Sequence, residues 1–191
     1  MKLFRALAKN LRILWERLSL QGLWTTTKWA ADHAVRIITG APIRSVSQIT
    51  PHLHVGGQYR QRGWKRLAAR GITAVVNLRI EFDDAAANIA PPHYLYLPAV
   101  DDTPPTLEQL HEGSGFIAEE IARGGGVYVH CGAGIGRAAT MAAAYLVSTG
   151  LSTEQAWGSI RAVRPFIRPK PIQVEQVERF ASSNPSTHTS A

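Results

Sequence analysis

The single cysteine of this 191-residue chain lies in a stretch that combines groups suited to phosphate chemistry. Cys131 follows His130, and Arg137 comes six positions later. The five residues between them are Gly132, Ala133, Gly134, Ile135 and Gly136. Glycines allow backbone conformations in which successive N–H groups turn to one side, and such groups bind anions. The stretch therefore predicts an anion-binding loop with a thiol at its base.

The expected surroundings of Cys131 favour its ionised form. Amides that point at a bound anion also stabilise a thiolate, and a helix beginning near Arg137 adds the positive end of its dipole. The planar guanidinium of Arg137 fits two oxygens of a phosphate. Because a thiolate that faces a phosphoryl group is an in-line nucleophile, the pattern predicts attack of sulfur on phosphorus. The alternative is an inert buried cysteine in a tight turn, which leaves the arginine at this spacing unexplained.

Other phosphate-binding motifs fit the stretch less well. No Gly-Lys-Ser/Thr ends the run, as a nucleotide-binding P-loop requires. The letters GAGIGR imitate a dinucleotide fingerprint, but its acidic partner is not evident. A lone cysteine also excludes an intrachain disulfide.

The charge of the chain indicates an anionic partner. Lys and Arg number 21 against 14 Asp and Glu, which gives a formal net charge of +7. Nucleic acid is not expected, because neither an aromatic-studded sheet nor a recognition-helix motif accompanies this charge. No apolar run approaches the roughly 18 to 20 residues that a membrane-spanning helix needs.

The elements that must position Cys131 and Arg137 alternate between strands and helices from about 45 to 182, which predicts an α/β catalytic domain with a mainly parallel sheet flanked by helices. Strands are expected at 72–78, 93–100 and 127–130, with short strands in 49–57. Helices are expected at 64–70, 106–123, 138–148, from 152, and at 172–180. The glycine loop thus joins a strand to a helix N-terminus.

Residues 1–40 are expected to form a basic amphipathic helical extension with a second helix at 23–38. One interpretation places residues 1–20 on an anionic membrane surface. Another is a helical hairpin packed on its own domain, and a third is a transit peptide, against which Glu16 and Asp32 argue. Residues 183–191 are polar and are predicted to be a disordered tail.

The letters HCGAGIGR resemble the signature of the cysteine-dependent protein tyrosine phosphatase superfamily, and the short domain resembles its dual-specificity branch. Segments 100–110, 124–147 and 164–180 are similar to mitochondrial-type phosphatases that act on phosphatidylglycerophosphate, and to their bacterial relatives. The resemblance covers about 45–182 and implies the dual-specificity phosphatase fold. It also implies hydrolysis of phosphomonoesters with neither a metal nor a cofactor.

The resemblance assigns roles to the residues of the loop and to an upstream aspartate. Cys131 takes the phosphoryl group, while Arg137 and the amides of 132–136 stabilise the transition state. An aspartate protonates the leaving oxygen and then activates water. The family pattern points to Asp101, with Asp102 as the alternative and two solvated loop carboxylates as a further one. His130 is expected to orient the loop rather than to act as a base.

One departure from the family concerns turnover. The family usually has serine or threonine directly after the arginine, whereas this chain has Ala138. Either slow release of phosphate from the sulfur, or another group that substitutes for this hydroxyl, is therefore expected. A pseudophosphatase that binds phosphate without turnover is the alternative function.

The implied substrates are proteins carrying phosphotyrosine, phosphoserine or phosphothreonine, or an anionic phospholipid such as phosphatidylglycerophosphate or a phosphoinositide. Highly phosphorylated inositol heads are less expected, because the loop carries no charge between Cys131 and Arg137. Two basic clusters either meet a second phosphate or are solvated surface: Arg60, Arg62, Lys65 and Arg66; and Arg161, Arg164, Arg168 and Lys170. The expected location is cytoplasmic, peripheral on a membrane surface, or mitochondrial in a eukaryote.

Overall fold

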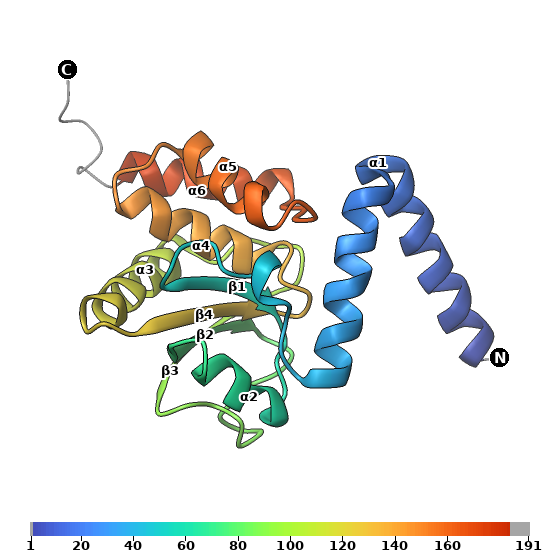
Figure 1. The fold of residues 1–191 in the computed structure, drawn as a ribbon. Coiled ribbons are helices and arrows are strands. Elements are labelled where there is room, and N and C mark those ends of the chain that lie inside the picture. Colours follow the sequence, from blue (N-terminus) through green and yellow to red (C-terminus); the bar gives the residue numbers. More distant parts are fainter. Residues whose placement is uncertain (1, 184–191) are drawn as a thin grey trace.

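A computed structural model describes residues 2–183, with side chains from residue 18 onward. Its centre is one four-stranded sheet (Figure 1). The strands are β1 (Leu53–Gly57), β2 (Ile72–Arg79), β3 (His93–Ala99) and β4 (Gly126–Cys131), in the order β1-β4-β2-β3. Each strand is parallel to its neighbours in the sheet. The predicted α/β fold with a mainly parallel sheet is therefore confirmed.

Helices cover both faces of this sheet. The helices of the described chain are α1 (Lys2–Thr39), α2 (Gln61–Ala68), α3 (Leu107–Ala122), α4 (Arg137–Ser148), α5 (Thr153–Val163) and α6 (Pro171–Ser183), with a short 3-10 turn at Arg44–Val46. Figure 1 shows α3 to α6 on one face and α2 on the other. Two of the helices begin after a polar capping residue. Thr106 forms a capping box at the N-terminus of α3, and Ser152 forms one at the N-terminus of α5.

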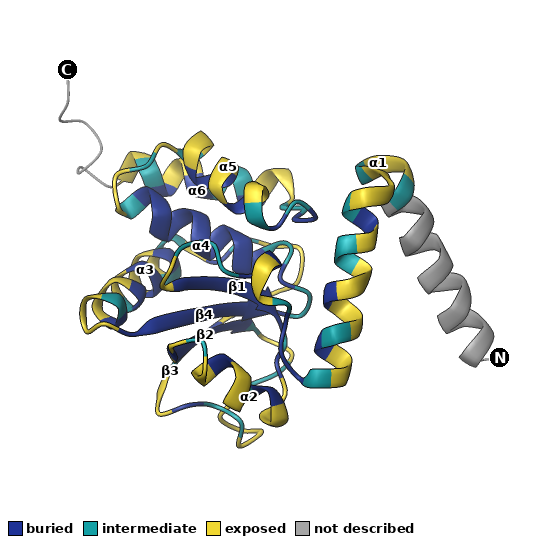
Figure 2. Ribbon diagram, in the orientation of Figure 1, coloured by how far each residue is buried: buried dark blue, intermediate teal, exposed yellow. Residues whose placement is uncertain are grey.

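Helix α4 is the centre of the larger core. Residues 137–147 of this helix are all buried, and Figure 2 shows it as dark as the strands beneath it. Five of these residues are alanines, whose small side chains let the helix lie close to the sheet and to its neighbouring helices. Since α4 begins directly after the glycine loop, its tight packing fixes the far end of that loop.

Helix α1 joins the two predicted N-terminal helices across a kink. The kink lies at Gly22, whose φ of 77° is a conformation that favours glycine. After it, residues 23–39 contact the domain, and Asp32 and Arg36 on this half are buried. Residues 23–39 thus pack on the domain, as the hairpin interpretation expects of its second helix, whereas the side chains of residues 1–17 lie outside the described part of the chain.

The observed ends of two segments differ from the predicted ones. Helix α2 starts at Gln61 and ends at Ala68, earlier than the predicted 64–70. Tight turn bonds from the amides of Arg70 and Gly71 close the chain after it, and Gly71 has a φ of 83°. Helix α6 includes Ser183, and residues 184–191 of the predicted tail lie outside the description. None of the helices in 2–183 combines the length and the apolarity needed to cross a membrane.

Candidate active site

Cys131 is the last residue of β4, a central strand of the sheet, and lies opposite Gly57 of β1. Its side chain is buried, and the loop 132–136 curves over it before α4 begins. The amide of Gly134 donates to Sγ at 3.3 Å. The sulfur of Cys131 therefore faces an N–H donor of the loop, a contact of the kind that the sequence predicts.

The loop needs glycine where it passes close to β1. Gly134 has a φ of 69°, and a Cβ on it would lie 2.2 Å from the carbonyl carbon of Gly56. Gly136 is less restricted, since a Cβ there would lie 3.0 Å from the side chain of Gln173. At Gly134, backbone conformation and close packing thus both require glycine.

Arg137 begins α4 and is almost completely buried. Its Nη1 donates to the carbonyl oxygens of Leu78 at 3.2 Å and Ala99 at 2.7 Å. Both Nη atoms bind the Glu81 carboxylate at 2.9 Å, and Nη2 pairs with Asp101 at 2.8 Å. Among the described residues, Nε has no hydrogen-bond partner. The guanidinium is therefore rigidly held, with one buried donor left for an anion.

The charge of Arg137 is maintained despite burial. Burial acts to lower the pKa of Arg137, but the hydrogen bonds to Glu81 and the charges of Cys131 and Asp101 raise it overall. The same contact lowers the pKa of Glu81 to about 2, with a further hydrogen bond from Arg79. The arginine and this glutamate thus form a fixed ion pair beside the loop.

The two candidate acids lie at the mouth of the site. Asp101 and Asp102 follow β3, and their side chains are 80% and 71% exposed. Asp101 pairs with Arg137, whereas Asp102 has a φ of 62° and pairs with Lys170 at 3.3 Å. Both line one pocket of about 230 Å³ together with Cys131, Gly132, Ala133, Ile135, Gly136, Arg168 and Gln173.

His130 is fully buried near the end of β4 and is not among the residues that line this pocket. Its Nε2 contacts the Asp84 carboxylate at 2.8 Å, and Nδ1 has no partner within 18–183. The other oxygen of Asp84 accepts from the side chain of Gln58 at 2.7 Å, and the amide of Gln58 donates to Gly132 at 3.1 Å. His130 is thus linked to the loop through two intermediates, an arrangement in keeping with an orienting role.

Ala138 places no hydroxyl near the sulfur. It is fully buried at the start of α4. The next hydroxyl along the helix, that of Thr140, donates to the Gly136 carbonyl at 3.1 Å, one turn back along the chain. Neither residue therefore places a hydroxyl that donates to the Cys131 sulfur.

Several residues that hold the site had no motif in the sequence. Glu81 and Asp84 follow the end of β2, and their position after a parallel strand was the signal available for finding them. Gln173 of α6 is buried and donates to the Thr103 carbonyl at 2.9 Å, which connects the aspartate loop to α6. Asp32 and Arg36 of α1 gave no such signal.

The two basic clusters are not uniform surfaces. Arg164 is fully buried, contrary to a solvated-surface interpretation of its cluster, because it forms hydrogen bonds with carbonyl groups of the glycine loop. Arg168 lines the Cys131 pocket, and Arg161 lies over the ring of Trp157. In the other cluster, Arg62 donates to the carbonyl of Ile37 in α1.

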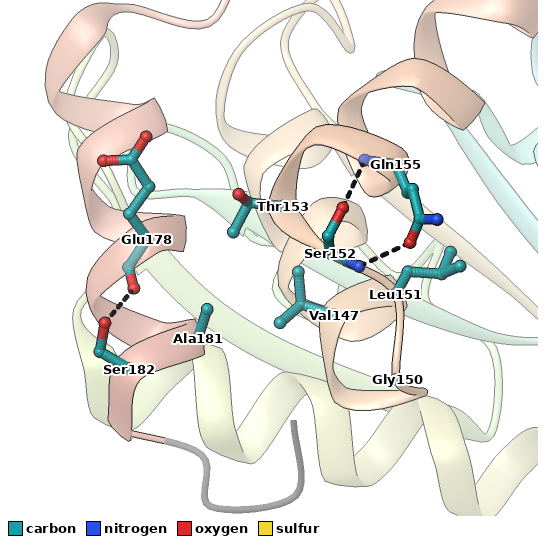
Figure 3. Close-up of a pocket in the computed structure, with 9 residues that line it drawn as sticks. All are labelled: Val147, Gly150, Leu151, Ser152, Thr153, Gln155, Glu178, Ala181 and Ser182. Carbon is teal, nitrogen blue, oxygen red and sulfur yellow. Dashed lines mark hydrogen bonds between the residues drawn. The ribbon is translucent and has the colours of Figure 1, made fainter. Parts of the chain in front are cut away.

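A larger pocket lies elsewhere and lacks catalytic groups (Figure 3). Its volume is about 490 Å³, and it lies between the α4–α5 junction and α6. Ser152 and Gln155 bind one another in the capping box of α5, and Glu178 is the one ionisable residue of its lining. The smaller pocket, which is lined by the thiol of Cys131 and two carboxylates, is the candidate active site.

Comparisons with known proteins agree with this geometry. The family model of the dual specificity phosphatase catalytic domain matches residues 53–183. Dual specificity protein phosphatase 14 of Mus musculus is 34% identical over 142 residues, which are 71% of this chain and 69% of that protein. Phosphatidylglycerophosphatase and protein-tyrosine phosphatase 1 of Mus musculus is 44% identical over 88 residues, but these cover only 45% of this chain and 46% of that protein.

Solved structures share the fold. The crystal structure of PTPMT1 in complex with PI(5)P has a TM-score of 0.67 and 30% identity, and the match covers 72% of this chain and 95% of that one. The crystal structure of Tk-PTP in the active form has a TM-score of 0.64 and 28% identity, over 72% of this chain and 97% of the other. Both similarities extend over most of the α/β domain.

Proposed function

Because this chain belongs to the dual-specificity phosphatase family, we propose that it hydrolyses phosphomonoesters through a cysteinyl-phosphate on Cys131. The observation that carries the proposal is the convergence at one pocket of the thiol, the loop amides and Asp101, with the guanidinium of Arg137 paired to that aspartate. These are a nucleophile, an oxyanion-type donor set and a proton donor, the three functions that phosphoryl transfer requires.

In the proposed mechanism, hydrogen-bond donors of the loop and of Arg137 bind the substrate. The dianionic phosphoryl group accepts hydrogen bonds from the amides of 132–136 and from Nε of Arg137, the buried donor described above. It also competes with Asp101 for Nη2, while Glu81 keeps the guanidinium oriented. Binding therefore moves Asp101 from the arginine to the ester oxygen on the opposite side of phosphorus.

The reaction then proceeds in two displacements. The Cys131 thiolate forms an S–P bond as the P–O bond to the leaving group breaks, and protonated Asp101 gives its proton to the departing oxygen. In the second step, the Asp101 carboxylate takes a proton from water, whose oxygen attacks phosphorus as the S–P bond breaks. Inorganic phosphate leaves, and both the thiolate and the protonated aspartic acid are restored.

The contact between Asp101 and Arg137 supports Asp101, rather than Asp102, as the general acid. Asp101 lies 2.8 Å from Nη2 of the phosphate-binding guanidinium. Asp102 is turned toward Lys170 by a left-handed backbone conformation. Asp102 therefore holds Lys170 at the rim of the pocket, where the lysine adds positive charge.

The proposed substrates are a phosphoprotein or an anionic phospholipid, with phosphatidylglycerophosphate as the lipid candidate. One relative is named for both activities, and the PTPMT1 structure contains PI(5)P. In this chain, Arg168 lines the pocket and Lys170 stands at its edge, so a second anionic group on the substrate would meet positive charge. This favours a substrate with a phosphodiester near its phosphomonoester.

A membrane surface is the proposed place of action. Residues 1–20 are basic, and the kink of α1 that follows them exposes Leu20, Leu23 and Trp24 to 68%, 71% and 72%. Apolar side chains beside basic residues suit the interface of an anionic bilayer. The proposed location is thus peripheral on a cytoplasmic membrane surface, or on a mitochondrial one in a eukaryote.

A turnover panel tests this function. The full chain is assayed on a phosphotyrosine peptide, a phosphoserine peptide, phosphatidylglycerophosphate and phosphoinositides, each with Cys131→Ser as the control. We expect turnover by the wild type and none by the variant, with the highest kcat/KM on phosphatidylglycerophosphate. Phosphate binding without turnover would instead support the pseudophosphatase function that Ala138 suggests.

Vesicle flotation tests the membrane contact separately. We expect the chain to float with vesicles of anionic lipid, and the double change Leu23→Ser and Trp24→Ser to weaken this binding. Equal flotation of the variant and the wild type would exclude the kink as the contact.

A further inference from the structure

Two buried arginines hold three successive carbonyl groups of the glycine loop. Nη1 of Arg36, from α1, donates to the carbonyl of Gly132 at 3.3 Å. Arg164, which follows α5, donates from Nη2 to Ala133 at 3.0 Å and from Nε to Gly134 at 2.6 Å. The loop is thus bound on its outer side by two guanidinium groups.

Helix α1 also fixes both arginines. Asp32 pairs with Nη2 of Arg164 at 3.3 Å and accepts from the amide of Ile43 at 2.9 Å. Arg36, one turn further along the same helix, donates to the carbonyl of Gln58 at 3.0 Å. Burial lowers the pKa of Arg164, and the charge of Asp32 opposes that shift. The carboxylate of α1 therefore balances a charge that would otherwise be buried alone.

Holding these carbonyl groups also directs the amides that face the phosphate. In a planar trans peptide, the C=O and the following N–H point in opposite directions. The carbonyls of residues 132, 133 and 134 share their peptide planes with the N–H groups of 133, 134 and 135. The amide of Gly134, one of these three, does point at the Cys131 sulfur. Fixing the outer side of the loop thus fixes the inner donors.

Gly57 lies where Arg36 of α1 comes closest to the glycine loop. A Cβ on Gly57 would lie 2.6 Å from Cζ of Arg36 and 2.8 Å from the carbonyl oxygen of Gly132. Glycine at the end of β1 therefore lets the arginine reach the loop. In Figure 1 the second half of α1 stands beside the end of the sheet where this contact is made.

We propose that Asp32 and Arg36 are positioning residues for the phosphatase reaction, which makes residues 23–39 part of the catalytic unit. Both residues lie outside the segment 53–183 that the family model matches. The proposal rests on the proposed function, since it takes the loop to be the phosphate site. It predicts that damage to α1 weakens phosphate binding, although none of the described side chains of this helix, in residues 18–39, lines the pocket.

The experiment measures the affinity of the full chain for inorganic phosphate and for tungstate, as competitive inhibitors of a small aryl phosphate. Arg36→Ala and Asp32→Asn should each weaken that affinity and reduce kcat/KM by about tenfold, because a hydrogen bond from a charged group contributes about one tenfold step. Arg36→Lys should recover part of the loss, because an ammonium can donate to one of the two carbonyls that Arg36 binds.

Two controls separate positioning from stability. Ile117→Ala removes buried side-chain volume in α3, a helix that contributes no residue to the Cys131 pocket, and should lower the melting temperature without changing phosphate affinity. Lys28→Ala removes a cation of α1 that lies over Trp24, and should change neither quantity. All assays are made well below the melting temperature of each variant, so that only folded protein is compared.

The outcomes are distinct. If Arg36→Ala melts at a lower temperature but binds phosphate as the wild type does, the proposal is overturned, and Arg36 has a structural role alone. A loss of affinity in Ile117→Ala equal to that in Arg36→Ala would overturn it as well. If the wild type binds neither anion and has no activity, the proposed function itself fails. Should Asp32→Asn not fold, the comparison of Arg36→Ala with Arg36→Lys decides the question.

Discussion

The guanidinium of Arg137 contacts the carboxylates of Glu81 and Asp101, and the two contacts differ in geometry and exposure. Glu81 binds it through both oxygens, and this bonding lowers the pKa of Glu81 to about 2. Asp101 makes one contact and is largely exposed. The bidentate partner therefore sets the orientation of the arginine, while the single exposed partner is free to exchange with a phosphate oxygen. In the proposed mechanism, Glu81 thus positions the guanidinium and Asp101 transfers the proton.

Changing Glu81→Gln should reduce kcat/KM on an aryl phosphate by about tenfold, because the charged bidentate hydrogen bonds that orient Arg137 are weakened. Since the pKa of Glu81 is about 2, the carboxylate does not titrate in the assay range. The ratio of wild type to variant should therefore be constant between about pH 5 and 8. Initial rates across that range would measure it, and a ratio that changes with pH would contradict this role.

Changing Asp101→Asn should slow esters of poor leaving groups far more than esters of good ones, because only the former need a proton on the departing oxygen. The matched control is Asp102→Asn, which alters the neighbouring carboxylate that pairs with Lys170. A series of aryl phosphates with graded leaving groups gives the dependence. If Asp102→Asn shows the steeper dependence, the assignment of the two residues is reversed.

Changing Ala138→Ser should speed the second displacement by about tenfold, since a hydroxyl that donates to the departing thiolate lowers the barrier by about one such step. The wild type should then show a burst of aryl alcohol followed by slower turnover, and the burst should shrink in the variant. Ala139→Ser, on the next residue of the buried helix, is the control. A burst of equal size in the two proteins would show that the added hydroxyl does not speed the second displacement, and a wild type without a burst would show that this step does not limit turnover.

Strand β1 carries a buried group that responds to acid. His54 is 1% exposed, and within 18–183 neither ring nitrogen has a hydrogen-bond partner. Burial, with the charge of Arg70 next in importance, lowers the pKa of His54 to about 4. The unfolded chain takes up this proton near pH 6.5, whereas the folded chain takes it up only near pH 4. Its contribution to stability is therefore complete above pH 6.5 and is lost as the pH falls toward 4.

His54→Leu should reduce the acid sensitivity of the fold. The loss of unfolding free energy between pH 7 and pH 4 should be smaller in the variant by up to about 3 kcal/mol. Urea unfolding at the two pH values measures this difference, and the carboxylates common to both proteins cancel in the comparison. An equal loss in the two proteins would mean that His54 titrates in the folded state as it does in the unfolded one.

The molecule as a whole shows which features a sequence can predict. The glycine loop was predicted because its residues are contiguous, and the α/β fold because each element has its own periodicity. The contacts that hold the loop were not predicted, because their partners are far apart in the sequence. Asp32 and Arg164 are 132 residues apart, and His130 and Asp84 are 46 residues apart. The apolar pattern of residues 1–40 also could not show whether this segment contacts lipid or its own domain. The second half of α1 contacts the domain through two buried charged residues, Asp32 and Arg36, which an apolar pattern does not include.

The most direct measurement of the central claim is the mass of the protein during turnover. The full chain is mixed with an excess of a small aryl phosphate, quenched within the burst in alkaline denaturant and digested. We expect the peptide that contains Cys131 to gain the mass of one PO₃ group, and the Cys131→Ser protein to gain none and to have no activity. Hydrolysis that continues in Cys131→Ser, or turnover without a phosphorylated cysteine, would contradict the account.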